Sequence, residues 1–424
     1  MIGIRNGHIV DPVTGRDEIA DIIIEGNTIR QLGQDLDLSQ ADRVIEASGW
    51  ITAPGLVDTH VHFRDPGFPW KEDIFTGAAA AKKGGFTTVI CMANTSPTID
   101  TPERLQANLA RGERGEQTGI HVLQTAAVSV GLRGETLTDM EALAAAGAAG
   151  FTDDGIPLMD EGLLREAMER AAALDLPISL HEEDPAFIAS PGVNQGAASR
   201  QLGLGGASAL AEDALVARDC MIALATGARV VIQHISSGNS VKMVRAAKAM
   251  GAHVYAEATP HHFTLTEEAV LRYGTLARMN PPLRTEADRQ EILRGLQDGT
   301  IDVIATDHAP HSAKEKARPF AEAPSGITGL ETSLALGVTV LVRGGILTMS
   351  ELIDRMSRRP AELYHLHPQG IAPGAPADLV LFAPDETFHP APFASRATNS
   401  PFADWELYGP VKFTLCGGKI VYEA

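Results

Sequence analysis

The feature that most constrains the fold is an alternation of short apolar runs with helical stretches along the middle of the chain. This alternation is typical of βα units, in which helices join parallel strands and cover the sheet. We count eight apolar runs, and eight parallel strands can close into a barrel. The runs are 55–63, 86–94, 120–128, 149–155, 177–183, 229–237, 253–262 and 301–311. The sequence therefore predicts an α/β protein with a (β/α)8 barrel, the TIM-barrel architecture.

The stretches between the runs, and the ends of the runs, add detail to this prediction. Residues 162–174 and 209–227 are rich in alanine and amphipathic, so we expect helices that pack around the barrel. Most of the eight runs have apolar residues first and His, Asp, Asn or Glu at or near their ends. These polar ends should gather at the C-terminal mouth of the barrel, where barrel enzymes place their active sites.

Both ends of the chain read as short β-strands. The first 49 residues contain apolar runs separated by Asn-Gly and Gly-Asn turns, and the residues from about 375 onward resemble them. Two β-rich ends around one long middle predict that the termini fold together as a small accessory sheet. The expected division is 1–52 and 366–424 for this β module and 53–365 for the barrel.

Charge and cysteine content narrow the class of function. The formal net charge of −19 argues against nucleic-acid binding, because phosphate backbones are held chiefly by Lys and Arg. Cys91, Cys220 and Cys416 are widely spaced, which suits a reducing compartment without structural disulfides. No run reaches the roughly 20 apolar residues of a membrane span. We expect a cytoplasmic protein with no nucleic-acid or membrane partner.

The sharpest motif is DTHVHFRDPG at 58–67. Residues two apart on a strand point to the same face, so His60 and His62 can reach one metal ion together. A single histidine on a strand is more often a packed core residue. Two histidines at this spacing, at the end of the first barrel strand, favour a pair of metal ligands.

Further candidate ligands stand at the ends of later strands. They are Asp153, Asp154, His181, His234 and Asp307. Each has a simpler reading by itself, because an Asp before Gly forms turns and a His can cap a helix. Together on one rim they would be costly without a role, since buried unpaired polar groups destabilise a fold. Imidazole and carboxylate donors favour Zn²⁺, with Mn²⁺ or Co²⁺ as substitutes. Two ions would need a bridging anion, which the fourth strand can supply.

Four motifs in order carry a family resemblance. They are DTHVHFRDPG at 58–67, FTDDG at 151–155, MNPPLR at 279–284 and the stretch at 305–332. Over nearly its whole length the chain resembles dihydroorotase of the bacterial class I kind, in the amidohydrolase superfamily. That resemblance implies the same barrel with a returning accessory sheet, and a metal-dependent hydrolase of cyclic amides.

The resemblance also implies a ligand set. One metal ion would be held by His60, His62 and Asp307, and a second by His181 and His234. Many relatives bridge the two ions with a carboxylated lysine, but 151–155 contains no lysine. The departure matches class I, in which an aspartate takes the bridging place. We assign the bridge to Asp154, with Asp153 as the alternative.

Substrate contacts are implied as well. The residues are His62, Arg64, Asn94, Asn280 and His311, with backbone help from Ser325 and Gly326. The planar guanidinium of Arg64 suits a carboxylate, and the alternative reading is a surface arginine paired with Asp65. Without the resemblance, Asn280 would be left unassigned. His261 and His262 are read as supports of the ligands rather than as ligands.

The implied reaction is the reversible hydrolysis of L-dihydroorotate to N-carbamoyl-L-aspartate in pyrimidine biosynthesis, with Asp307 as the catalytic acid and base. One alternative is an allantoinase or dihydropyrimidinase, against which Arg64 and the missing lysine count. Another is an inactive scaffold partner of aspartate carbamoyltransferase, which would be expected to lose metal ligands. A homodimer and an association with that transferase stay open.

Overall fold

The computed structural model describes residues 1–112 and 118–424, and its centre is a closed barrel of parallel strands. The barrel strands are β6 (Leu56–Val61), β7 (Phe86–Cys91), β8 (His121–Gln124), β9 (Phe151–Thr152), β10 (Ile178–Leu180), β11 (Val230–Ile232), β12 (Val254–Ala258) and β13 (Val303–Ile304). Strands β6 to β8 form one ladder and β9 to β13 the other. Parallel bridges join Ala126 to Phe151 and Val61 to His308, which closes the barrel. The predicted barrel is confirmed.

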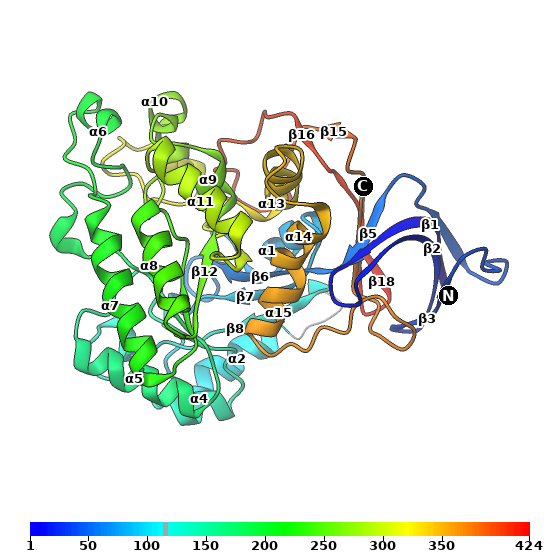
Figure 1. The fold of residues 1–424 in the computed structure, drawn as a ribbon, viewed down its shortest axis with the longest axis horizontal. Coiled ribbons are helices and arrows are strands. Elements are labelled where there is room, and N and C mark those ends of the chain that lie inside the picture. Colours follow the sequence, from blue (N-terminus) through cyan, green and yellow to red (C-terminus); the bar gives the residue numbers. More distant parts are fainter. Residues whose placement is uncertain (113–117) are drawn as a thin grey trace.

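Helices surround the barrel strands (Figure 1). The longer ones are α1 (Ile74–Lys83), α2 (Pro102–Gly112), α5 (Glu161–Ala173), α7 (Leu210–Thr226), α8 (Gly238–Ala249), α11 (Glu286–Asp298) and α13 (Leu330–Leu336). Helices α5 and α7 match the two predicted amphipathic stretches. In α5 the side chain of Asp160 caps the first turn, and the buried residues between Leu164 and Ala171 recur at helical spacing.

Shorter helical segments connect these elements. They are α4 (Met140–Ala145), α6 (Ala197–Gln201), α9 (Pro260–Thr264), α10 (Ala269–Tyr273), α12 (Ala313–Lys316), α14 (Met349–Ile353), α15 (Arg359–Leu363), η1 (Val130–Leu132), η2 (Pro185–Phe187), η3 (Gly274–Ala277), η4 (Gly337–Val342) and η5 (Asp354–Arg358). Helix α9 shortens the seventh predicted run, because β12 ends at Ala258 and the Thr259 side chain caps a new helix. Among the described residues, no helix combines the length and apolar character needed to cross a membrane.

The two ends of the chain form one sheet beside the barrel (Figure 1). Its strands are β1 (Ile2–Asp11), β2 (Arg16–Glu25), β3 (Thr28–Gly33), β4 (Arg43–Glu46), β5 (Ile51–Pro54), β14 (Leu379–Phe382), β17 (Val411–Cys416) and β18 (Lys419–Glu423), and a separate ladder pairs β15 (Thr387–Phe388) with β16 (Leu407–Tyr408). The ends meet where β14 runs antiparallel to β5, with Val380 opposite Ala53. Ile4, Ile22 and Leu415 belong to the separate apolar core of this sheet. The predicted accessory sheet is confirmed, while the boundaries after residues 52 and 365 remain our proposal.

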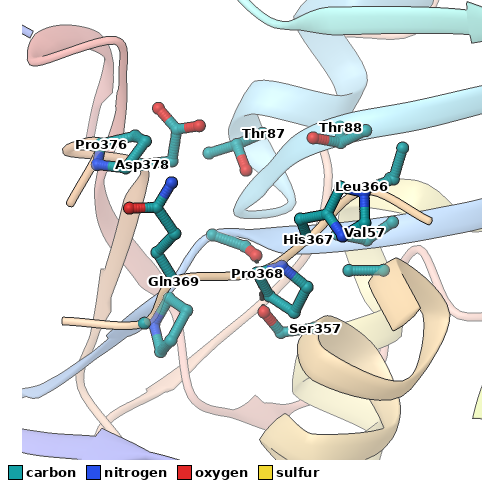
Figure 2. A pocket seen from close by; sticks show the side chains of 14 residues that line it. Val57, Thr87, Thr88, Ser357, Leu366, His367, Pro368, Gln369, Pro376 and Asp378 are labelled. Atoms are coloured by element: carbon teal, nitrogen blue, oxygen red, sulfur yellow. Dashed lines mark hydrogen bonds between the residues drawn. The ribbon is translucent and has the colours of Figure 1, made fainter. Parts of the chain in front are cut away.

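A cavity of about 180 Å³ lies where the accessory sheet meets the N-terminal ends of β6 and β7 (Figure 2). Thr87, Thr88, His367, Gln369 and Asp378 are among its lining residues. None of the residues predicted to bind metal or substrate lines it. The residues predicted to bind metal and substrate belong instead to the C-terminal ends of the barrel strands.

Candidate metal centre

Four histidines and two aspartates from five strand ends meet in a buried cluster at the C-terminal mouth of the barrel. The residues are His60 and His62 of β6 and its end, Asp154 after β9, His181 after β10, His234 after β11 and Asp307 after β13. His60 Nε2 lies 3.3 Å from Asp154 Oδ1 and 3.6 Å from Asp307 Oδ1. His62 Nε2 lies 3.4 Å from Asp154 Oδ2 and 3.0 Å from Asp307 Oδ1. The structure thus brings the predicted first ligand group together around Asp154.

His181 and His234 join the same cluster. His181 Nδ1 lies 3.0 Å from His234 Nε2. These two nitrogens lie 3.9 Å and 3.8 Å, respectively, from Asp154 Oδ1. All six residues that the sequence predicted as ligands are therefore neighbours in the fold, and Asp154 is common to both predicted ligand groups.

The outward nitrogen of three of the imidazoles faces a hydrogen-bond acceptor. The pairs are His60 Nδ1 with Glu257 Oε2 at 3.1 Å, His62 Nδ1 with Asn94 Oδ1 at 3.0 Å, and His181 Nε2 with Glu183 Oε2 at 3.1 Å. An imidazole that donates its N–H outward keeps a lone pair on the opposite nitrogen, which is the form that binds a metal ion. In each pair the opposite nitrogen points into the cluster.

A divalent cation fits this donor set. His60 Nε2 is buried and has no hydrogen-bond partner among the described residues, so its lone pair is unsatisfied there. When His181 donates outward to Glu183, its Nδ1 has only a lone pair to present to His234 Nε2. The groups His60–Asp154–His234 and His60–His62–Asp307 each hold three ligand atoms within 4.8 Å of one another. Imidazole and carboxylate donors are those that Zn²⁺ and neighbouring divalent ions take.

The two neighbouring aspartates of the fourth strand end have different surroundings. Asp153 faces the loop after β8, where its Oδ1 accepts from the backbone N–H groups of Val128 and Ser129 at 2.8 Å and 3.0 Å. The Ser129 hydroxyl also donates to Asp153. Asp154 instead offers one oxygen to His60 and the other to His62. Asp154 is therefore the aspartate whose position suits a bridge between two ions.

Both inward carboxylates are held in the ionised form. When protons rather than a cation occupy the cluster, burial opposes the charge of Asp154, but a protonated His60 and a hydrogen bond with His234 keep the pKa of Asp154 well below its usual value. Burial likewise raises the pKa of Asp307, yet a hydrogen bond with His62 and the charge of His60 lower that pKa overall. A cation that replaces these protons would favour the same ionised carboxylates. An ionised carboxylate can bind a cation or accept a proton.

A cleft of about 120 Å³ opens onto the cluster. Six of the seven predicted substrate contacts line it, and they are His62, Arg64, Asn94, Asn280, Ser325 and Gly326. Asn280 Oδ1 is buried and has no hydrogen-bond partner, so it can accept from a bound molecule. Cations, amides and ionised carboxylates thus converge on one small space, as in a substrate site.

Arg64 lies along this cleft, and its neighbour Asp65 has a different partner. Asp65 pairs with Arg111 at 2.6 Å, so the alternative reading of Arg64 as the partner of Asp65 is wrong. His311 is not among the lining residues. Its Nε2 lies 2.8 Å from Ser325 O and 3.4 Å from Arg64 Nη2, which puts His311 behind Arg64 rather than beside the substrate space.

Two of the predicted substrate contacts are already bonded within the chain. Asn94 Oδ1 accepts a hydrogen bond from His62 Nδ1, and Asn94 Nδ2 donates to Asp154 Oδ2 at 3.0 Å. Asn94 therefore orients two residues of the cluster. The Gly326 N–H donates to Arg278 O at 3.0 Å. Gly326 has a φ of 137°, and a Cβ there would lie 2.6 Å from Ala309 O, so only glycine fits.

Our reasoning from the sequence did not single out Glu257 and Glu183, the acceptors behind His60 and His181. Glu257 is fully buried in β12, where its other oxygen accepts from the Thr59 hydroxyl at 2.6 Å. A glutamate in an otherwise apolar strand is the signal that could have found it. His262, read as a support, lies 3.1 Å from Pro281 O through Nε2.

Known proteins resemble this chain over its full length. A family model described as Dihydro-orotase-like matches residues 49–240. Dihydroorotase of Clostridioides difficile is 57% identical over 424 residues and that of Clostridium acetobutylicum is 50% identical over 425, and each match covers 100% of both chains. A solved L-hydantoinase from Arthrobacter aurescens matches with a TM-score of 0.85 at 24% identity, over 100% of this chain and 96% of its own. A dihydropyrimidinase from Brevibacillus agri matches at 0.86 and 23%, over 99% and 95%.

The high TM-scores of these solved structures support the fold. Their identity to this chain is low, so they support the fold alone. The full-length dihydroorotase relatives, together with the buried imidazole and carboxylate cluster at the barrel mouth, show a metal-dependent hydrolase of the amidohydrolase type. The full-length relatives narrow this class further. The chain belongs to the dihydroorotase family, as the resemblance of its motifs predicted.

Proposed function

We propose that the chain catalyses the reversible hydrolysis of the cyclic amide of L-dihydroorotate to N-carbamoyl-L-aspartate in pyrimidine biosynthesis. The single observation that carries this proposal is the position of Arg64 in the same cleft as the buried His and Asp cluster. A cyclic amide with a carboxylate needs both a cluster that attacks the amide and a cation that holds the acid group. The family to which the chain belongs supports the same substrate.

Two Zn²⁺ ions per chain are our proposal for the cofactor. One would be held by His60, His62 and Asp307, the other by His181 and His234, with Asp154 as the bridge. The support is the set of inward nitrogens and the two oxygens of Asp154, which face different histidines. When bound, such ions lower the pKa of a water molecule and polarise a carbonyl group.

Asp307 is the proposed catalytic acid and base. It is ionised, and its Oδ1 is turned towards the cluster, 3.0 Å from His62 Nε2. From there it accepts the proton of the attacking water and later gives that proton to the ring nitrogen as the C–N bond breaks. The same proton is taken up and returned, and because water itself attacks the carbonyl carbon, no side chain forms a covalent intermediate.

Arg64 is the proposed anchor for the substrate carboxylate. Its neighbour His311 donates from Nε2 to Ser325 O, and Lys71 Nζ lies 3.3 Å from the other nitrogen, so His311 offers Arg64 no acceptor. Arg64 Nε donates to Pro310 O, which leaves the N–H groups of its two Nη atoms for a ligand in the cleft. Asn280, Ser325 and Gly326 are proposed to line the substrate, with Asn280 Oδ1 as an acceptor for a ring N–H.

The nearest alternative is an allantoinase or a dihydropyrimidinase. Solved structures of that kind have the same fold, but their neutral substrates give Arg64 no carboxylate to hold. The fourth strand also ends in Asp154 where many relatives have a lysine. An inactive scaffold partner of aspartate carbamoyltransferase is disfavoured because all six proposed ligands lie together.

Further parts of the proposal concern the surroundings of the enzyme. We propose a cytoplasmic location, which three free cysteines support. A homodimer and an association with aspartate carbamoyltransferase are proposed as well. Size-exclusion chromatography of the chain, alone and mixed with the transferase, tests both, since each complex would elute earlier than the single chain.

The deciding experiment measures turnover of dihydroorotate, allantoin and dihydrouracil by the purified protein, together with its metal content. We expect dihydroorotate to be preferred and chelation to abolish turnover, with zinc restoring it. Preference for either neutral compound would overturn the assignment. Full turnover after complete removal of metal would overturn the proposed cofactor.

A further inference from the structure

Three chemically different ligand types meet at the junction between the barrel and the accessory sheet, away from the cluster at the mouth. His121 begins β8, Asp378 immediately precedes β14 and Cys416 ends β17. Because His121 stands at the N-terminal end of a barrel strand, this group lies at the opposite end of the barrel from the candidate metal centre. The fold alone brings the three residues together, since they are far apart in sequence.

The three side chains lie close together, and a hydrogen bond from the backbone fixes the orientation of Asp378. His121 Nε2 lies 3.2 Å from Asp378 Oδ2, and one ligand atom of each residue, with the Cys416 sulfur, falls within 4.8 Å of the others. The backbone N–H of Gly417 donates to Asp378 Oδ1 at 2.6 Å, which turns Oδ2 towards His121. The Cys416 thiol also makes a long contact of 3.9 Å to Thr87 O.

We propose that His121, Asp378 and Cys416 form a second zinc site, separate from catalysis. Imidazole, carboxylate and thiolate are three of the donor types that Zn²⁺ takes, at roughly 2.0 to 2.3 Å in tetrahedral geometry. Ligand atoms around such an ion lie about 3.5 Å apart, so small side-chain rotations close the group observed here. Binding displaces two protons, that of the Cys416 thiol and the one that His121 shares with Asp378, and both leave to solvent.

Access and exposure suit an ion that enters from solvent. A surface hollow of about 560 Å³ is lined by His121, Cys416, Lys82 and Lys419. The His121 side chain is 55% exposed and that of Asp378 is 25% exposed, while Cys416 is buried. The hollow leaves room for water or a small anion as the fourth ligand, whose charge the two lysines would accommodate.

The plainer reading is an ion pair between His121 and Asp378 with a packed thiol beside it. That reading accounts for the 3.2 Å contact and the Gly417 hydrogen bond. It leaves the sulfur as a neutral thiol with one ligand atom of each charged group within 4.8 Å. A metal ion accounts for the closeness of all three side chains, the imidazole, the carboxylate and the thiol. It would also link β8 of the barrel to two segments of the accessory sheet.

Cobalt substitution separates this site from the catalytic one. The cluster at the mouth has only nitrogen and oxygen donors, so a thiolate-to-Co²⁺ charge-transfer band in the near ultraviolet reports the Cys416 site alone. We expect this band in the metal-free protein refilled with Co²⁺ and in Cys220→Ser, whose buried thiol is a matched control. Cys416→Ser should lose the band and one equivalent of bound metal, while dihydroorotate turnover stays normal.

A surface variant keeps the test decisive if Cys416→Ser does not fold. His121→Ala changes an exposed side chain, and we expect it to weaken Co²⁺ binding at this site at least about tenfold, seen as a rightward shift of the titration of the band. No band in the unaltered protein at saturating Co²⁺ would overturn the proposal. A band that persists in Cys416→Ser, or an unshifted titration in His121→Ala, would overturn it too.

Discussion

The substitution Arg64→Lys tests the proposed anchor for the substrate carboxylate. Lysine keeps the positive charge but presents a single ammonium in place of a planar fork. The guanidinium lies along the cleft with Nε 3.4 Å from Pro310 O, and His311 beside it offers no acceptor. The change therefore removes bidentate geometry at the ligand while leaving the metal cluster intact.

The expected loss follows from the value of one charge-assisted hydrogen bond. Such a bond contributes about 1 to 3 kcal/mol, and part of the second contact of the fork is lost with lysine. At 1.4 kcal/mol for each factor of ten, kcat/KM for dihydroorotate should fall roughly 5-fold to 150-fold. The metal content should not change, because among the described residues the hydrogen-bond contacts of Arg64 are with Pro310 and His311, and neither is a proposed metal ligand.

Steady-state kinetics and metal analysis of Arg64→Lys, beside the control Arg165→Lys, make the measurement. Arg165 is 69% exposed on α5 and pairs with Glu169 on the same helix, so its replacement should leave kcat/KM unchanged. An unaltered kcat/KM in Arg64→Lys would refute the anchor. Loss of metal from that variant would refute the separation of substrate binding from the metal cluster.

Three further predictions concern the carboxylates and one buried lysine. Asp154→Ala should lose metal, because it removes the oxygens that face His60 and His62. Asp307→Asn should keep much of the metal and lose turnover, since an amide cannot accept the proton. Metal stoichiometry and kcat of both variants check this, and a near-normal kcat in Asp307→Asn would mean that another residue transfers the proton. Asp153→Ala should retain metal and lower the free energy of unfolding by about 1 to 3 kcal/mol, because two backbone N–H groups lose their acceptor. If Asp153→Ala lost metal and Asp154→Ala did not, the bridge would be assigned to the wrong aspartate. Burial lowers the pKa of Lys316 to about 7, so above that pH the unfolded chain binds more protons than the folded one. The free-energy penalty for burying Lys316 therefore shrinks as pH rises towards 10.5. Relative to the unaltered chain, Lys316→Met should raise the urea midpoint of unfolding more at pH about 6.5 than at about 9.5, and a difference independent of pH would contradict this.

Periodicity and motif order were enough to predict the barrel and its rim. Apolar runs ending in polar residues predicted β6 to β13, and the His60 and His62 pair pointed to a metal site at their C-terminal ends. The reason is local: alternation along a strand and the direction of parallel strands are encoded by neighbouring residues. The same local rule did not apply at His261 and His262, because the Thr259 cap starts helix α9 there.

Tertiary structure decided what depends on contacts between distant segments. Asp153 and Asp154 are adjacent and identical in chemistry, and only the loop after β8, which bonds Asp153, leaves Asp154 to the histidines. The pairing of Asp65 with Arg111 rather than with Arg64 is another such choice. Glu257 behind His60, and Cys416 beside His121, likewise come from strands far apart in the chain. Sequence spacing carries no record of such pairs, because long-range register and side-chain direction are set by packing of the whole barrel against its sheet.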